Sequence, residues 1–133
     1  MKIEIGNDSN LPLYKQIYNQ LKLKIIKGEL KQGDLLPSIR ELSKTLNLSV
    51  ITVKRAYSEL EHNKYITTHQ GKGCYVSTID LEKEFMNNKL NAEKRLKRVI
   101  SESKLLGLNN EDIKSIFEKL LANKTNKEKQ VAS

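Results

Sequence analysis

A lysine between two glycines, and a cluster of hydroxyl and cationic side chains, are the residues best suited to binding an anion. Lys72 stands between Gly71 and Gly73, where a turn lets the backbone approach a phosphate closely. The cluster occupies one short stretch and consists of Ser49, Thr52, Lys54 and Arg55. Hydroxyl, ammonium and guanidinium groups donate hydrogen bonds to phosphate oxygens and to the edges of bases. These residue types therefore favour binding to a nucleic acid.

The overall charge points the same way. The chain has 24 Lys and Arg against 16 Asp and Glu, a net charge of +8. An excess of this size indicates an acidic partner, of which nucleic acid is the commonest. The sequence contains no Ser/His/Asp arrangement and no phosphate-binding loop, so we expect no enzyme, no catalytic residue and no cofactor.

The histidines and the single cysteine offer little further chemistry. His62 and His69 have no metal-ligand spacing, so we expect no metal site. Cys74 has no second cysteine to resolve an oxidised form and is interpreted as a small strand residue. The sequence has no apolar run near the roughly 18 residues of a membrane span and no secretory signal at its start, which predicts a cytoplasmic protein without membrane contact.

The cluster is predicted to lie in a helix-turn-helix. A first amphipathic helix follows Pro12 and carries apolar residues every four positions, namely Leu13, Ile17, Leu21 and Ile25. Ser38, with Glu41 three residues later, predicts the start of a second helix that ends near Asn47. Ser49 predicts the start of a third. Two short helices joined by about three residues form the helix-turn-helix outline.

The lysine between glycines is predicted to lie at the tip of a hairpin. Residues 65–69 and 74–78 have strand composition and flank a turn at 70–73. A helix-turn-helix followed by such a hairpin is a winged helix. We therefore expect a domain over residues 1–79, with residues 30–36 as a loop or short strand and a weak strand signal at Ile3–Ile5. Its expected core is Leu13, Ile17, Leu21, Leu42, Leu46, Val53, Leu60, Ile66 and Val76.

Beyond Asp80 the pattern changes to long helices. An apolar stripe predicts a helix to about Leu106, Gly107 ends it, and Asn109 caps a final helix. Residues 80–122 are thus expected to form a two-helix segment, and the polar residues 123–133 a disordered tail. One short final helix cannot cover the long stripe, which predicts a homodimer through this segment.

Several motifs occur in a fixed order at fixed spacing. They are Pro12-Leu13-Tyr14-Lys15-Gln16-Ile17, Gly28-Glu29-Leu30, residues 33–42, residues 52–61 and Gly71-Lys72-Gly73. In these the chain resembles the GntR family of bacterial transcription regulators, over about residues 10–77. The short helical tail resembles that of the YtrA subfamily, which serves for dimerisation. The resemblance implies a mainly α fold with a small β-hairpin: a winged helix-turn-helix domain followed by a two-helix dimerisation segment.

The resemblance also implies a function and a site. The chain would be a sequence-specific regulator, a repressor that binds as a homodimer to an inverted repeat in double-stranded DNA. The DNA-contacting residues would be Arg40, Ser49, Val50, Ile51, Thr52, Lys54, Arg55, Gln70, Gly71 and Lys72. Arg55 has an alternative, an ion pair with Glu59 four residues later. The four tyrosines Tyr14, Tyr18, Tyr57 and Tyr65 are interpreted as core aromatics.

Three positions depart from the family pattern. Many relatives have Arg or another polar residue at position 50, whereas this chain has Val50 followed by Ile51, which can contact thymine methyls but cannot donate to guanine. This favours a more AT-rich site. Relatives have Gly at position 64, where Lys64 would be strained in a left-handed conformation, and Asn63 offers an alternative. Cys74 replaces the usual Thr of the wing.

One alternative comes from another functional class. The loss of Arg at position 50 permits an adaptor that uses the winged helix to bind a protein, although the retained cations argue against it. A small-molecule effector stays an open question, and a short helical tail makes a sugar or fatty-acid pocket unexpected.

Overall fold

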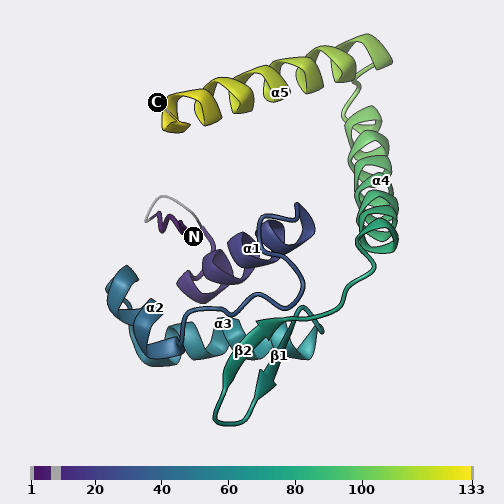
Figure 1. The fold of residues 1–133 in the computed structure, drawn as a ribbon. Coiled ribbons are helices and arrows are strands. Elements are labelled where there is room, and N and C mark those ends of the chain that lie inside the picture. The colour runs from purple at the N-terminus through teal and green to yellow at the C-terminus, as the bar shows by residue number, and fades with distance from the viewer. Residues whose placement is uncertain (1, 7–9, 133) are drawn as a thin grey trace. The chain divides into compact units, whose positions relative to one another are not determined.

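The computed structural model describes residues 2–6 and 10–132. In these ranges the elements are α1 (Leu13–Ile26), α2 (Ile39–Leu46), α3 (Val50–His62), β1 (Ile66–His69), β2 (Gly73–Val76), α4 (Leu81–Leu105) and α5 (Asn110–Ala132) (Figure 1). Residues up to Phe85 form one compact unit and residues from Met86 form another. The expected fold class, mainly helical with one small hairpin and a winged helix-turn-helix, is confirmed.

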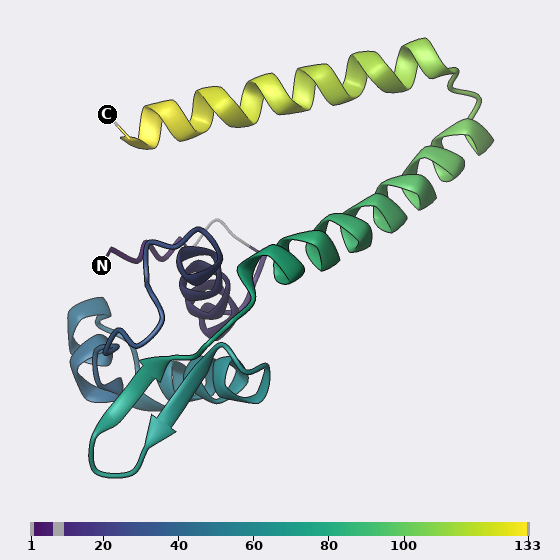
Figure 2. The same ribbon diagram turned by 45° about the vertical axis from the view of Figure 1, so that its right-hand side comes forward.

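The core of the first unit lies where α1 and α2 pack against α3 (Figure 2). Ile17, Leu21, Val53 and Leu60 are fully buried there. Leu13 was expected in this core and is 37% exposed, so that prediction was wrong. Each step of four residues turns about 40° round a helix, so two steps carry Leu13 about 80° away from Leu21, to the edge of the buried face.

The helix-turn-helix begins and turns at the predicted residues. The Ser38 hydroxyl accepts a hydrogen bond from the Glu41 N–H at 3.1 Å, and the Ser49 hydroxyl accepts one from the Thr52 N–H at 3.2 Å. Asn47 ends α2 in the left-handed conformation, with φ 55°. Both predicted N-caps are therefore confirmed.

The hairpin forms with the expected composition, and a third segment joins it. Strands β1 and β2 are antiparallel, and Ile66 lies opposite Val76. The Leu36 N–H donates to the Cys74 carbonyl at 2.9 Å, and Leu35 forms an isolated bridge with Tyr75. The segment before α2 therefore lies along β2 through backbone hydrogen bonds and one isolated bridge, which ties the start of α2 to the wing.

Two glutamines of α1 hold the segment that precedes it. The Gln16 amide oxygen accepts from the Gly6 N–H at 3.0 Å, and its nitrogen donates to the Gly6 carbonyl at 3.1 Å. Gln20 contacts Glu4 in the same two-way manner, accepting from its N–H at 2.8 Å and donating to its carbonyl. Residues 2–6 form no strand, in contrast to the weak signal there, because side-chain amides rather than a partner strand bind their backbone.

Lys64, and not Asn63, takes the left-handed conformation after α3. Its φ is 66°, whereas Asn63 has φ −87° and donates a side-chain hydrogen bond to the Tyr18 hydroxyl at 2.7 Å. The prediction that Asn63 offers the left-handed residue was wrong. Asn63 is held by its contact with α1, so the strained turn falls on the next residue.

We expect Lys64→Gly to stabilise the protein by up to about 1 kcal/mol. A left-handed non-glycine residue costs about 1–2 kcal/mol, which exceeds the roughly 0.5–1 kcal/mol of extra chain entropy that glycine loses on folding. Urea unfolding of both chains gives the difference. The matched control is Asn63→Gly, which relieves no strain, removes the bond to Tyr18 and should destabilise. A Lys64→Gly protein less stable than wild type would contradict the strain argument.

The second unit contains most of α4 and all of α5, joined at Gly107, which has φ 93°. Asn109 caps α5 as predicted, because its side-chain oxygen accepts from the Asp112 N–H at 2.9 Å and the Asp112 carboxylate accepts from the Asn109 N–H at 3.0 Å. The structure continues α5 to Ala132, whereas we expected a disordered tail from residue 123. Lys, Glu, Gln and Ala in this stretch all have high helix propensity. Ser133 lies outside the described residues.

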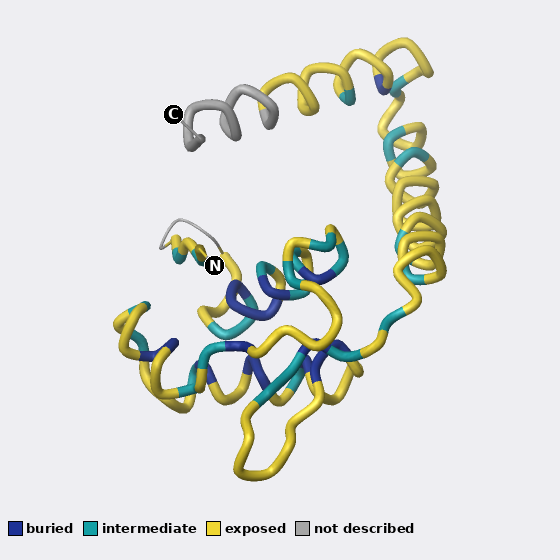
Figure 3. The backbone as a smooth tube through the Cα atoms, viewed as in Figure 1, coloured by how far each residue is buried: buried dark blue, intermediate teal, exposed yellow. Residues whose placement is uncertain are grey.

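Most residues of α4 and of the described part of α5 are exposed (Figure 3). Several large apolar side chains are among them. Ile113 of α5 is only 8% exposed, but many other large apolar side chains of α4, of α5 and of the turn between them are exposed. The exposed ones include Phe85, Met86, Leu90, Leu96, Val99, Leu105, Leu106, Ile116 and Leu120. No helix among the described residues has the length and hydropathy needed to cross a bilayer.

Candidate nucleic-acid interface

The exposed face of α3 carries four of the predicted contact residues. Val53, Ala56, Tyr57 and Leu60 turn inward, which places the remaining positions of the helix at the surface. The predicted contacts on this outer side are Val50, Ile51, Lys54 and Arg55, with Ser49 at the N-cap and Thr52 half-buried. Ile51 is 79% exposed and Val50 is 47% exposed, so both present apolar surface to solvent.

A buried hydroxyl fixes the start of α2 beside α3. Tyr57, on the inner side of α3, donates to the Pro37 carbonyl at 2.7 Å. Burial raises the pKa of Tyr57 well above its usual value, so the phenol stays protonated and remains a donor. This bond places the start of α2 beside the middle of α3. Arg40 lies in the first turn of α2 and is exposed.

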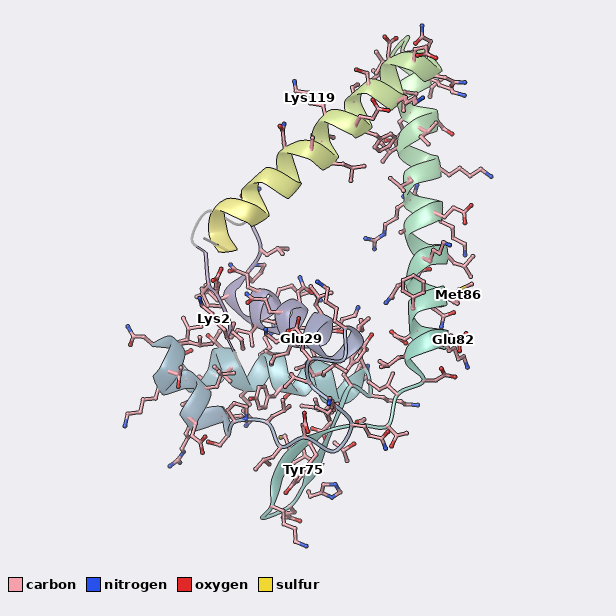
Figure 4. All side chains as sticks on the ribbon, turned by 45° about the horizontal axis from the view of Figure 1, so that its top comes forward. Lys2, Glu29, Tyr75, Glu82, Met86 and Lys119 are labelled. Atoms are coloured by element: carbon pink, nitrogen blue, oxygen red, sulfur yellow. The ribbon has the colours of Figure 1, made fainter. Side chains whose placement is uncertain are left out.

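The tip of the wing is exposed and is braced at its base. Gln70, Gly71 and Lys72 are all exposed, and Gly71 has φ 77°, which a residue with a side chain rarely adopts. The Lys72 N–H donates to the His69 carbonyl at 2.9 Å, and the hydroxyl of Tyr75 (Figure 4) donates to the Lys72 carbonyl at 3.0 Å. The tip thus presents its cation from an ordered turn.

A side-chain hydrogen bond ties the wing to α3. The Thr68 hydroxyl of β1 donates to the Glu61 carboxylate of α3 at 3.1 Å. Together with the bond from Tyr57 to Pro37, this contact places the wing and the start of α2 against the same helix. The three elements that carry Arg40, the α3 cluster and Lys72 are therefore parts of one unit.

Arg55 has a different partner from the one considered above. Its guanidinium lies over the ring of Tyr14 in α1, 3.8 Å from the ring centre. Glu59 pairs instead with Lys15, at 3.5 Å. The alternative ion pair between Arg55 and Glu59 was therefore wrong. The ring contact was missed because it joins residues far apart in the sequence, and no local spacing signals it.

His69 and Cys74, considered above as possible chemical groups, make packing contacts within the wing. His69 packs edge-on against Tyr75, with ring centres 5.3 Å apart. Cys74 is half-buried and its sulfur lies 3.4 Å from the Thr68 hydroxyl. In the part of the chain that the structure describes, no three His, Cys, Asp or Glu side chains gather in a way that could hold a metal ion. Tyr18, Tyr57 and Tyr65 are core aromatics as expected, whereas Tyr14 is half-buried.

Known proteins share this arrangement. Residues 13–76 match the family model described as bacterial regulatory proteins, gntR family. The chain is 44% identical over 75 residues to the HTH-type transcriptional repressor YtrA of Bacillus subtilis, an alignment that covers 56% of this chain and 58% of that protein. The chain thus spans somewhat over half the length of this relative.

Solved structures extend the similarity into the helical segment. A GntR family transcriptional regulator from Listeria monocytogenes is 36% identical with a TM-score of 0.65, covering 84% of this chain and 97% of that one. YtrA from Sulfolobus acidocaldarius, a GntR-family transcription factor, is also 36% identical, with a TM-score of 0.56 and coverage of 69% and 97%. The likeness therefore includes residues beyond the winged helix.

Proposed function

This chain belongs to the GntR family of bacterial regulatory proteins, and on that premise we propose that it is a transcriptional repressor that binds an inverted-repeat operator as a homodimer. The observation that carries the proposal is the exposure of Arg40, Lys54 and Lys72 on three elements that hydrogen bonds hold together. A bacterial regulator of this kind works on DNA in the cytoplasm.

The start of α3 would enter the major groove, as the recognition helix of a helix-turn-helix does. The Ser49 and Thr52 hydroxyl oxygens lie 2.7 Å apart, so one O–H is used between them and the other is left to donate to a phosphate. The exposed Val50 and Ile51 side chains would meet thymine methyl groups. This apolar pair favours operator positions rich in A·T pairs.

The wing would bind beside the groove. Lys72 brings a positive charge to the tip, and Gln70 and Gly71 let the backbone come close to a phosphate or to the minor groove. Arg40, at the start of α2, would contact phosphate or guanine. These contacts would fix the register of α3 on the duplex.

The homodimer would form through the long helices. Their exposed apolar side chains include Leu90, Leu96, Val99 and Leu120. Exposed apolar side chains gathered on one surface are a common mark of a protein–protein contact. A second copy of the chain would cover these faces. Two copies related by a two-fold axis would then match the two halves of an inverted repeat.

We expect Arg40→Ala and Lys72→Ala each to weaken DNA binding by about 1–3 kcal/mol without unfolding the protein. Both side chains are exposed, so the free energy of unfolding should change by less than about 0.5 kcal/mol. The measurement is a titration against DNA that the wild-type chain selects from a random library. It is paired with thermal unfolding of each variant.

The matched control is Lys27→Ala. Lys27 is an exposed lysine at the C-terminal end of α1. Tyr18, in the middle of α1, already contacts Asn63 just after the end of α3, so Lys27 lies beyond α3 and away from the predicted contacts. Removing it should leave DNA affinity unchanged. If the control loses as much affinity as Arg40→Ala, binding reflects net charge rather than this site, and the proposal fails. A variant that unfolds at a much lower temperature would show that the residue is structural.

A further inference from the structure

The contact between Tyr14 and Arg55 joins α1 to the outer side of the recognition helix. Tyr14 belongs to the first turn of α1 and is half-buried, whereas Arg55 is exposed. The guanidinium centre is 3.8 Å from the ring centre, which is close contact for a planar cation on an aromatic face. Arg55 follows the highly exposed Ile51 by one helical turn, so it lies on the same side of α3.

The stack orients the guanidinium and leaves its hydrogen-bond donors unused. The five N–H groups of a guanidinium lie in its plane, so a ring that covers one face blocks none of them. A long arginine side chain also loses rotamer freedom when it binds, which costs conformational entropy. The stack orders the side chain beforehand, which reduces that cost at the moment of binding.

The acidic residue nearest in helical spacing is engaged elsewhere. Glu59 follows Arg55 by four positions, but its carboxylate lies 3.5 Å from the Lys15 ammonium. Lys15 in turn lies 4.5 Å from the centre of the Tyr18 ring. The partner of Arg55 is therefore a neutral ring, and its positive charge stays available to an anion.

We propose that Tyr14 is a positioning residue that holds Arg55 ready to bind a backbone phosphate of DNA on the α1 side of the recognition helix. This inference rests on the proposed function. Tyr14 itself makes no contact with the DNA and acts through the arginine. A phosphate contact carries no sequence information, so the pair adds affinity to any duplex and none of the preference for the operator.

The test measures full-length wild type, Tyr14→Leu, Tyr14→Phe, Arg55→Gln and the double variant Tyr14→Leu/Arg55→Gln. Each chain is titrated at several salt concentrations against selected DNA and against a scrambled duplex, and its thermal unfolding is recorded. Tyr14→Phe keeps the ring and is the matched control for Tyr14→Leu, which keeps an apolar side chain without a ring face.

We expect Tyr14→Leu to lose about two- to fivefold in affinity, equally on both duplexes, and Tyr14→Phe to bind like wild type. Arg55→Gln should lower the salt slope by about one unit per subunit. In the Arg55→Gln background, Tyr14→Leu should cost no further affinity, because the side chain that it positions is gone.

Any one of several results would overturn the inference. They include a salt slope unchanged in Arg55→Gln, an affinity loss from Tyr14→Leu that persists in full in the Arg55→Gln background, and an equal loss in Tyr14→Phe. Tyr14 would also have a purely structural role if Tyr14→Leu lowered the unfolding temperature and lost different amounts of affinity for the selected and the scrambled duplex. Absence of DNA binding by the wild-type chain would overturn the proposed function and this inference together, whereas binding indifferent to both residues overturns this inference alone.

Discussion

Raising the salt concentration from about 50 to about 200 mM should weaken DNA binding by as much as about 10⁴-fold. Arg40, Lys54, Arg55 and Lys72 are exposed in each subunit, and two subunits would bring up to about eight cations to the duplex. Each neutralised phosphate releases condensed counterions, which gives a log–log slope of about −7 at that limit. The free energy of this release is lost as salt rises.

The measurement is the dissociation constant at five or more salt concentrations, with selected DNA. Arg40→Ala and Lys72→Ala should each flatten the slope, whereas Lys27→Ala should retain it. A slope near zero would exclude direct recognition through these side chains. It would favour the alternative that the winged helix binds a protein.

A chain that ends at residue 85 should fold, remain a monomer and lose about 10²–10⁴-fold in affinity for a palindromic operator. The first unit has its own core, so it does not depend on the long helices for burial. We expected the boundary at residue 79, but Tyr65 donates a hydrogen bond to Glu84, and the first unit runs through Phe85. The truncation point is chosen to keep that bond.

The loss should appear on the palindrome and not on a single half-site. When two half-sites are engaged by linked domains, the second contact is intramolecular and gains from a high effective concentration. Sedimentation gives the oligomeric state, and titration against both DNAs gives the two affinities. A truncated chain that still sediments as a dimer would place the interface in the first unit. A full-length chain that stays monomeric at tens of micromolar would exclude the dimeric repressor.

Features set by neighbours in the sequence were predictable from it. Ser38, Ser49 and Asn109 cap helices because a short polar side chain reaches an N–H two or three residues later, and that geometry depends on local spacing alone. The hairpin follows in the same way from strand residues on both sides of a glycine-containing turn.

Features set by packing between distant segments were not predictable. Asn63 is the better left-handed residue by type, yet its bond to Tyr18 of α1 holds it elsewhere and leaves that conformation to Lys64. Arg55 has an acid at the favourable helical spacing, yet it lies on Tyr14, because packing of α1 on α3 brings that ring within reach. Each outcome depends on how α1 sits on α3, which no local pattern encodes.

The two glutamines that hold the segment before α1 recognise its peptide groups and not its side chains. Four helical residues rise about 6 Å and two extended residues span about 6.6 Å, so successive turns of α1 meet alternate peptides. Natural selection is therefore expected to keep Gln16 and Gln20 while the side chain at position 4 varies. Proline is the one residue that we expect selection to exclude there. Proline has no N–H to offer, so among relatives that retain both glutamines it should be missing from the positions that match Glu4 and Gly6.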